Sequence, residues 1–416
     1  MNSNCAFYFL SMNKNFRDFI FILLIFSFSC KEKAKEQFNL TSQTWEQIEK
    51  EASGKTVNWM MWTGDPSINA YVNNFVVPKI KVKYNINLEI SSGQGSVVVS
   101  NLLAEKDAGK EESELDMVWI NGETFYQLRQ VDALFGPFTD KLPNSNAIDF
   151  SNRFIGFDFQ QPVNGFECPW GNVQMCLIYD AYRLPKPPQT LTELSSFVKA
   201  NPGKFTFSND FTGMTLLKAW LIEFAGGEKE LAGKFNDEKY KKSSTKLWKY
   251  INANKINFWK QGKTFPNAVA PLHQLFVNKE VDITISNNDA EAENKVLQGF
   301  FPKTTRSYVP EYGTIQNSHY LGLVKNSTNK AAAMVVINFL VSPEAQLNKM
   351  NPATWGDGTV LDKNKLDSEW KQKFEKAAER KYSPKRKDIE SKALAELDPM
   401  YMVRLYDDFR KFVIEK

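Results

Sequence analysis

The chain has 416 residues, of which 42% are hydrophobic and 24% are charged, so it can form large apolar cores. A length of this order exceeds one ordinary core and indicates about two domains. Lysine and arginine number 52 against 48 acidic residues, which leaves a formal net charge of only +4. Because basic and acidic residues are nearly equal in number, the charge gives no reason to predict a nucleic-acid-binding surface.

The first thirty residues have the pattern of a secretory signal. Lys14 and Arg17 precede an apolar run over residues 19–26, and a small residue, Ser29, stands before Cys30. The run is far shorter than the roughly 20 residues that a membrane-spanning helix needs. A cysteine at this place makes residues 1–30 resemble a bacterial lipoprotein signal, which implies that Cys30 is acylated. The alternative is an ordinary cleaved signal with an incidental cysteine.

Residues 31–53 are charged and lack a strand pattern, so they are predicted to be a polar tether. Beyond them, short apolar strands alternate with longer helical patterns, which is typical of an α/β sheet. The first set is predicted as strands at 57–62, 88–92 and 116–120, each followed by a helix, at 68–84, at 97–108 and from 125 to 131.

A break rich in proline and glycine covers residues 134–166, and a second α/β set follows it. This set is predicted as strands at 173–179, 205–207 and 282–286 and helices at 190–201, 211–225, 238–256, 269–276 and 290–297. A second break over 300–318 leads to a strand at 319–324 and a mainly helical remainder. We predict two lobes joined by two extended crossings. Lobe 1 is assigned to 54–165 and 322–416, with the C-terminal helices packing back on it, and lobe 2 to 166–321.

Only Cys168 and Cys176 remain after removal of the signal. In one extended segment their separation would be roughly 25 Å, which is too far for a disulfide bond. Two free, buried thiols are therefore expected.

Five stretches of the sequence are specific rather than generic. They are LDMVWINGETF (115–125), LFGPF (134–138), TIQNSHY (314–320), KAAAMVVINFLVSPEAQ (330–346) and NPATWGD (351–357). Together they resemble the YnjB-type family of extracellular solute-binding proteins, within the family 1 class of ABC importers. The resemblance implies a type II periplasmic-binding-protein clamshell, in which two α/β lobes joined by two crossover segments close on a ligand and present it to a permease.

The ligand site is expected beyond the carboxyl ends of the strands, where open α/β sheets bind their ligands. The predicted binding residues are Trp62, Gly64, Asp65, Gly93, Gln94, Gly95, Ser96, Asn121 and Glu123 in the first lobe, Asp210, Thr212, Gly213, Asn287 and Asn288 in the second, Trp170, Asn172, Tyr312 and Asn317 on the crossings, and Trp355 at a cleft edge.

Simpler roles stay open for several of these residues. Asn121, Asp210 and Asn288 are also suited to cap helices. Gly93 and Gly95 could serve only a turn. Trp119, which lies within a strand, is expected in the core rather than at the ligand.

The sequence is poor in groups that could catalyse a reaction. His273 and His319 are its two histidines, and neither has metal-ligand spacing. Neither a Gly-x-Ser-x-Gly elbow nor a Walker loop is present. Glu123 with Asp210 as an acid–base pair, and Tyr312 with Tyr320 as iron ligands, are the less favoured alternatives. No catalytic residue, metal site or cofactor is predicted.

The predicted function is that of an exported, lipid-anchored solute-binding protein. We expect a monomer in the cell envelope, at the periplasmic or outer face of a bacterial membrane, that takes a small-molecule ligand to an ABC importer permease and binds no nucleic acid. The alternatives are an enzyme on the same fold and a surface lipoprotein that binds a macromolecule. Trp62, Asp65, Glu123 and Asp210 favour a flat or cationic ligand, while helix starts at Ser96 and Thr212 favour an anionic end.

Overall fold

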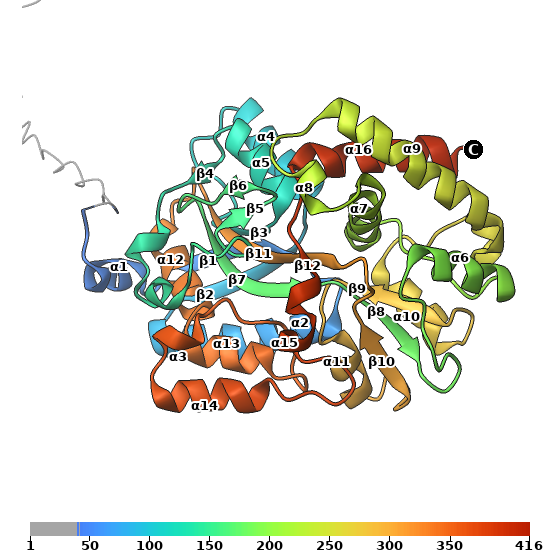
Figure 1. Ribbon diagram of the computed structural model, residues 1–416. Coiled ribbons are helices and arrows are strands. Elements are labelled where there is room, and N and C mark those ends of the chain that lie inside the picture. The colour runs from blue at the N-terminus through green and yellow to red at the C-terminus, as the bar shows by residue number, and fades with distance from the viewer. Residues whose placement is uncertain (1–39, 41) are drawn as a thin grey trace, which may run out of the picture. The chain divides into compact units, whose positions relative to one another are not determined.

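The computed structural model describes residue 40 and residues 42–416. The predicted signal, Cys30 and most of the predicted tether lie outside these residues. Residues 44–416 form one compact unit (Figure 1). Within the described part of the chain, no helix combines the length and the apolar character needed to cross a membrane.

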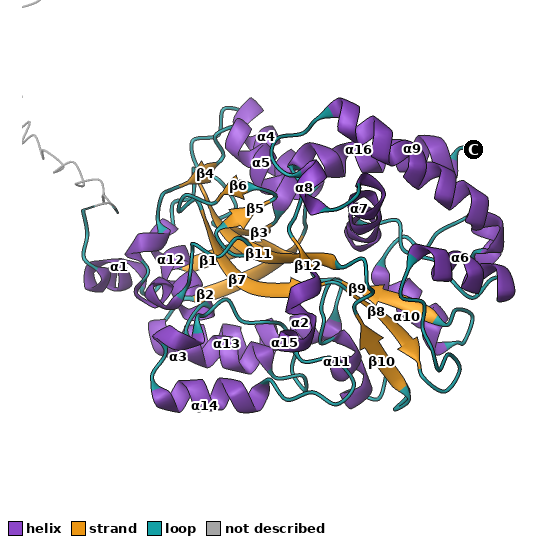
Figure 2. Cartoon of the chain, in the orientation of Figure 1, coloured by secondary structure: helices purple, strands orange, loops and turns teal. Residues whose placement is uncertain are grey.

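The larger sheet has seven strands, and its main path runs in the order β12-β11-β3-β1-β2, with β4 and β7 also paired to β11 (Figure 2). Strands β1, β2 and β3 are mutually parallel, whereas β11 runs antiparallel to β3 and β7. The strands are β1 Thr56–Met61, β2 Asn87–Ser92, β3 Met117–Ile120, β4 Leu134–Phe135, β7 Glu167–Gln174, β11 Thr314–Val324 and β12 Ala393–Leu394.

The helices that accompany this sheet come from both ends of the chain. They are α1 Trp45–Ala52, α2 Pro66–Tyr71, α3 Val77–Tyr84, α4 Ser96–Asp107, α5 Gly122–Gln130, α12 Lys330–Leu340, α13 Pro343–Met350, α14 Ser368–Ala377 and α15 Arg386–Ile389.

Two sequence expectations need correction in this region. The tether predicted over 31–53 contains α1, which Thr44 opens with a capping box and which buries Ile48 and Ala52. The single helix predicted over 68–84 is α2 and α3 joined by a π-helical turn over Val72–Val76. The wide turn precedes Pro78, which has no N–H to donate to the turn before it.

The smaller sheet has three antiparallel strands in the order β10-β8-β9. Its strands and helices are β8 Cys176–Asp180, β9 Ile283–Ser286, β10 Thr305–Tyr308, α6 Leu191–Ala200, α7 Phe211–Ala225, α8 Glu228–Leu231, α9 Asp237–Asn254, α10 Val269–Val277 and α11 Glu291–Leu297. A separate hairpin joins β5 Phe157–Asp158 to β6 Gln161–Pro162. Short 3₁₀ turns cover Thr139–Lys141, Pro143–Ala147, Lys255–Asn257, Trp259–Gly262, Lys363–Lys365 and Glu390–Lys392.

The strand predicted at 205–207 does not form. Phe205 and Phe207 are buried, so the apolar pattern marks core residues. The segment is nevertheless not paired with any described strand, and hydrophobicity alone does not supply a partner.

Strands β7 and β11 join the two sheets. Their antiparallel register runs from Gln174↔Gln316 to Glu167↔Gly322, with an irregularity at His319/Tyr320. One residue, Met175, separates β7 from β8 of the smaller sheet. These two strands are the two crossings expected from the sequence. Cys168 on β7 and Cys176 on β8 are free and buried, as predicted.

The last helix packs against both halves. Helix α16 (Pro399–Phe409), followed by a π-helical turn over Arg410–Ile414, was expected on the first lobe, and it contacts α5 there. Met402, Leu405 and Phe409 also enter the apolar cluster of α7 and α9, and the helix lies along the top of Figure 1 between α5 and α9. Its apolar residues recur at helical spacing and find the larger apolar surface there.

Gly122, the first residue of α5, lies where a side chain does not fit. Its φ is +34°, and an added Cβ would stand 2.1 Å from a ring carbon of Phe159. Its N–H donates to the carboxylate of Asp158, which replaces the cap that Asn121 does not provide. The glycine of the stretch 115–125 therefore serves the close approach of the β5–β6 hairpin.

We predict that Gly122→Ala destabilises the protein far more than Gly109→Ala. Gly109 also has a positive φ, +65°, but an added Cβ would meet nothing within 4 Å. The control should lose about 1 kcal/mol of unfolding free energy through backbone strain. Gly122→Ala should lose about 1–3 kcal/mol more through overpacking. Urea denaturation measures both, and equal losses would show that Phe159 does not confine Gly122.

Candidate functional site

The carboxyl ends of β1, β2 and β3 meet at one edge of the larger sheet because the three strands are parallel neighbours. Trp62 and Trp119 are both partly exposed there, in edge-to-face contact with ring centroids 6.5 Å apart. An added Cβ on Gly64 would lie 2.5 Å from Nε1 of Trp62, so the glycine lets this indole fold over the backbone. Trp119, expected in the core, therefore contributes to the exposed edge.

The loop after β2 brings backbone rather than side chains to the same edge. An added Cβ on Gly93 would lie 2.5 Å from Sδ of Met60, and Gly95 has a φ of +54° just before α4. The carbonyl of Gln94 accepts from the N–H of Val97. The two glycines thus serve the turn, and ligand contact by Gly93, Gln94, Gly95 and Ser96 stays a prediction.

Asp210, from the smaller sheet's half, is fully used as a helix cap. One carboxylate oxygen accepts from the N–H of Gly213 at 3.1 Å and from the hydroxyl of Ser208 at 2.6 Å. The other accepts from the N–H of Val269 at 3.1 Å. Beside this cap, Oγ1 of Thr212 accepts from Nδ2 of Asn287 at 3.2 Å. The capping role left open for Asp210 is the one the structure shows.

One junction between the halves is an ion pair between α2 and α11. Nζ of Lys295 lies 2.7 Å from Oδ2 of Asp65 and 3.5 Å from Oε1 of Glu291. Ser67 accepts from Nε2 of Gln298 at 2.9 Å. Burial alone would raise the pKa of Asp65, but Lys295 holds it below its usual value. Asp65 is thus already neutralised within the chain.

A second junction surrounds Lys218, the one charged residue among the first twelve positions of α7. Its side chain is fully buried and pairs with Glu396. The ammonium lies 4.0 Å from the ring centroid of Phe159 and 5.6 Å from that of Phe211. An aromatic and carboxylate cage therefore holds a lysine of α7 against the β5–β6 hairpin.

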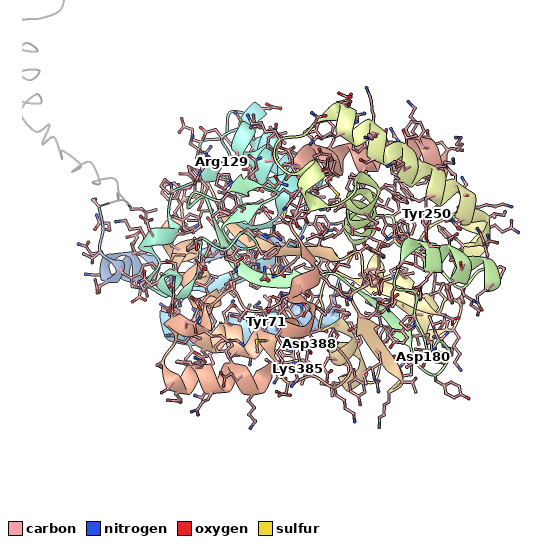
Figure 3. The ribbon with its side chains drawn as sticks, viewed as in Figure 1. Tyr71, Arg129, Asp180, Tyr250, Lys385 and Asp388 are labelled. Atoms are coloured by element: carbon pink, nitrogen blue, oxygen red, sulfur yellow. The ribbon has the colours of Figure 1, made fainter. Side chains whose placement is uncertain are left out.

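Further carboxyl groups near this cage have oxygen atoms without a hydrogen-bond partner among the described residues. Burial raises the pKa of Glu123, and it raises those of Asp158 and Glu167 well above their ordinary values. Among the described residues, Oε2 of Glu123, Oδ1 of Asp158 and both oxygens of Glu167 have no hydrogen-bond partner. Arg129, labelled in Figure 3, lowers the pKa of Glu167 but lies over the ring of Phe166, 3.4 Å from its centroid.

Four predicted site residues carry buried polar atoms without a partner in the described chain. These are Oε2 of Glu123, Nε1 of Trp170, Oδ1 of Asn287 and Nδ2 of Asn288, and Oγ1 of the neighbouring Thr124 joins them. Buried polar groups are normally hydrogen-bonded, so such atoms mark places where a further molecule could bind. Thr124 was missed because its position within a helix gave no signal.

Trp170 and Trp355 are packed in the core instead of lying at a ligand. Trp170 is 0% exposed and Trp355 is 6% exposed. Their rings lie 5.4 Å apart, each also in contact with Trp119 and His319. The strand-end rule specifies a region of the fold but not the face of the backbone on which each ring packs.

The predicted crossing residues are also held by internal contacts. Tyr312 accepts from Nε1 of Trp220 at 3.1 Å within the apolar cluster of α7. Asn172 donates to backbone carbonyls of Phe154 and Asn317, at 3.0 and 3.2 Å. Asn317 donates to Glu396 at 2.7 Å. These contacts hold the crossing in place, and ligand contact by these residues stays a prediction.

Asn172 also lines a polar pocket of about 400 Å³ beside the crossing, together with Gln316, Gly358 and Arg386. None of the other predicted binding residues lines this pocket. Among the described residues, no group of three or more His, Cys, Asp or Glu is arranged to hold a metal ion. The hydroxyl of Tyr320, one of the two tyrosines considered for iron, donates to the carbonyls of Ile155 and Phe157.

Lys218, Lys295 and Glu396 were missed by the sequence reasoning. A lone lysine in an apolar helix was a readable signal for Lys218. The other two form contacts between segments far apart in the chain, and local pattern carries no trace of these.

Comparison with known proteins places the chain in a family. The family of bacterial extracellular solute-binding proteins matches residues 76–378. The chain is 35% identical over 326 residues to Protein YnjB of Escherichia coli strain K12, covering 77% of this chain and 84% of that protein. This chain belongs to the bacterial extracellular solute-binding protein family.

Solved structures with the same fold cover nearly all of the described unit. The periplasmic binding protein AfuA from Actinobacillus pleuropneumoniae matches with a TM-score of 0.61 at 13% identity, over 87% of this chain and 99% of its own. The TpPotD lipoprotein of Treponema pallidum matches with a TM-score of 0.61 at 14% identity, over 87% and 100%. At such identities the likeness concerns the fold, and it confirms the predicted type II clamshell.

We predict that Glu167→Gln makes the protein more stable at pH 7. The folded pKa of Glu167 is raised above the ordinary value of 4.5, so the folded state holds a proton that the unfolded state loses. Its stabilising contribution is complete below the ordinary pKa and is lost as pH rises toward the folded one, by about 1.4 kcal/mol per unit of difference. Urea denaturation should show that the unfolding free energy falls less between pH 4.5 and pH 7 for Glu167→Gln than for the wild type.

Asp132→Asn serves as the control for this pH series. Asp132 is exposed and pairs with Lys325, which holds its pKa below 3.8. Its removal should therefore leave the slope between pH 4.5 and 7 unchanged. A Glu167→Gln profile parallel to that of the wild type would contradict the buried, protonated carboxyl.

Proposed function

We propose that this protein captures a small solute between its two lobes and delivers it to the permease of an ABC importer. Family membership supports capture of a solute, and the clamshell fold supports binding between lobes. AfuA is described with fructose-6-phosphate bound, and TpPotD is described as a lipoprotein. The single observation that carries the proposal is the set of unpartnered buried polar atoms on Glu123, Asn287 and Asn288, on the two sides of the clamshell.

Opening and closing would occur about the β7–β11 crossing. We assign 54–165 and 322–398 to the first lobe and 166–321 with α16 to the second, because α16 shares the apolar cluster of α7 and α9. The Asp65–Lys295 contact then joins residues from opposite lobes. A few element-terminal residues on two strands are sufficient for a hinge.

Binding without catalysis fits the state of the histidines. Nε2 of His273 lies 3.2 Å from the carbonyl of Ile285, and burial lowers its pKa to about 4. Nε2 of His319 lies 3.0 Å from Oδ2 of Asp357 in the core. Both are engaged in packing, and we propose no catalytic role for either.

Export and lipid anchoring are part of the proposal. The signal pattern that ends at Cys30 supports export and acylation of this residue. We propose a monomer held by lipid at the periplasmic or outer face of a bacterial membrane, where it would meet its permease.

We predict that protein purified from its own cells retains a non-covalently bound solute, visible by native mass spectrometry as added mass that unfolding and refolding removes. Trp62→Ala should retain less of it, because the partly exposed Trp62–Trp119 pair loses a ring. Trp259→Ala is the control, since its indole binds Glu280 at 3.0 Å outside the candidate site. Absence of added mass, with none regained from an extract of the same cells, would contradict solute capture.

We predict that Cys30→Ser abolishes membrane attachment without unfolding the protein. Acylation needs the thiol, and Cys30 lies outside the described unit of 44–416. In detergent phase separation of protein expressed in its own cells, the wild type should enter the detergent phase and the variant the aqueous phase. A wild type that stays aqueous would show that the cysteine is incidental.

A further inference from the structure

We infer that the solute carries a cationic nitrogen group, an ammonium or amidinium, that binds the carboxylate of Glu123. This inference rests on the proposed function and names the chemistry of the same site. It selects one of the three acidic residues that the sequence placed at the strand ends.

The other two acidic residues are already satisfied within the chain. Asp65 is paired with Lys295 at 2.7 Å and also caps α2. Asp210 uses both of its oxygens in capping α7 and in binding the N–H of Val269. Of these three acidic residues, Glu123 is the one that retains a buried carboxylate oxygen without a partner among the described residues.

The charges facing Glu123 leave a deficit of positive charge. The groups that act on it are Lys218 on α7, Glu396 after β12, Asp158 on β5 and Tyr406 on α16. Lys218 is the one cation among them, and its ion-pair partner is Glu396. Glu123 and Asp158 remain without a counter-cation of their own. A buried carboxylate is costly unless it is paired, and the alternative to a cation is a bound proton.

The neighbouring groups suit a flat or alkyl-bearing cation. Trp62 and Trp119 stand at the ends of adjacent strands with partly exposed rings, and aromatic faces attract cations. Oδ1 of Asn287 is a buried acceptor without a partner in the described chain, suited to an N–H donor. The cage around Lys218 shows that carboxylate and phenyl groups in this part of the fold already hold one ammonium.

An anionic solute is less well served. The N-terminus of α7 is occupied by Asp210, and the first N–H of α5 is occupied by Asp158. Helix starts attract anions through free N–H groups, and these two are already taken by carboxylates. This removes the support that the helix start at Thr212 gave to an anionic end, whereas the start of α4 at Ser96 has no side-chain cap and stays open to one.

Three isosteric probes test the inference: benzamidinium, benzamide and benzoate. The protein is the soluble Cys30→Ser form, stripped of retained solute by unfolding and refolding, and binding is followed by titration calorimetry and tryptophan fluorescence. Benzamidinium should bind the wild type, with benzamide about tenfold or more weaker, the loss expected for a charged hydrogen bond. Benzoate should not bind. Glu123→Gln should remove the preference, whereas Glu89→Gln, on the exposed face of β2, should keep it.

Calorimetry in buffers of different ionisation enthalpy measures the protons released on binding, a quantity that a purely structural role of Glu123 would not change. Burial raises the pKa of Glu123, and a cation bound to its carboxylate would lower that pKa. At pH values near the raised pKa, benzamidinium binding should therefore release protons from the wild type and not from Glu123→Gln. If Glu123→Gln does not refold, Glu123→Asp keeps the charge on a side chain that is shorter by one methylene. It should weaken benzamidinium binding, whereas Glu89→Asp should not.

Equal binding of benzamidinium and benzamide, including none by either, would overturn the cationic assignment. So would a preference that survives in Glu123→Gln. A neutral or anionic solute found by native mass spectrometry would also overturn it while leaving solute capture intact. Failure to retain any solute would count against the proposed function itself.

Discussion

The antiparallel pairing of β7 with β11 is the constraint on which the rest of the structure depends. β11 also pairs with β3, β4 and β12, so one strand connects the edge that bears Trp119 and Asn121 to the smaller sheet. At its irregularity, His319 lies so close to Gly171 that an added Cβ would stand 1.9 Å from Nε2. At this point of the crossing, the side chain of β11 therefore packs directly against the backbone of β7.

The ion pair beneath this crossing involves two of the five stretches that carried the family resemblance, 314–320 and 351–357. Asp357 accepts from His319 and binds the fully buried Lys349, whose ammonium lies 5.3 Å from the ring centroid of Trp355. Burial lowers the pKa of Lys349, and it would raise that of Asp357 were it not held below its usual value by His319 and Lys349. Residues from 314–320, 330–357 and the crossing thus serve as a support for the hinge.

The two junctions between the halves are alike. In each, a lysine from the smaller sheet's half lies against carboxylates from the other half. Lys295 meets Asp65, and Lys218 lies beside Asp158 and Glu123. Buried ion pairs contribute little net stability, because desolvation offsets attraction. A closed state held by such contacts would differ little in free energy from an open one. A solute that binds one of the two states better can therefore shift their populations.

The sequence predicted those elements whose pattern is local. Strands β1, β2 and β3 follow from short apolar runs, and the capping box at Thr190 correctly began α6. The strand at 205–207 failed because burial of two phenylalanines does not provide a pairing partner. The contact of α16 with α7 was not predicted, because an apolar stripe does not specify which surface it covers.

The candidate site was predictable to the same extent. A rule about strand ends found Trp62 and Glu123, which remain the strongest candidates. It also selected Trp170 and Trp355, since it specifies a region and not the side of the backbone on which a ring packs. Lys218 and Glu396 meet across 178 positions of the chain, and only the folded structure brings them together.

We expect the lobes to separate about the β7–β11 crossing when the solute leaves. Spin labels on Val82→Cys in α3 and Ile256→Cys after α9, which are 87% and 61% exposed, report the distance between the lobes. The native Cys168 and Cys176 are buried and would escape labelling. Pulsed electron resonance should give a longer and broader distance distribution for refolded, solute-free protein than for protein that retains solute. Identical distributions in the two states would contradict a hinge at this crossing.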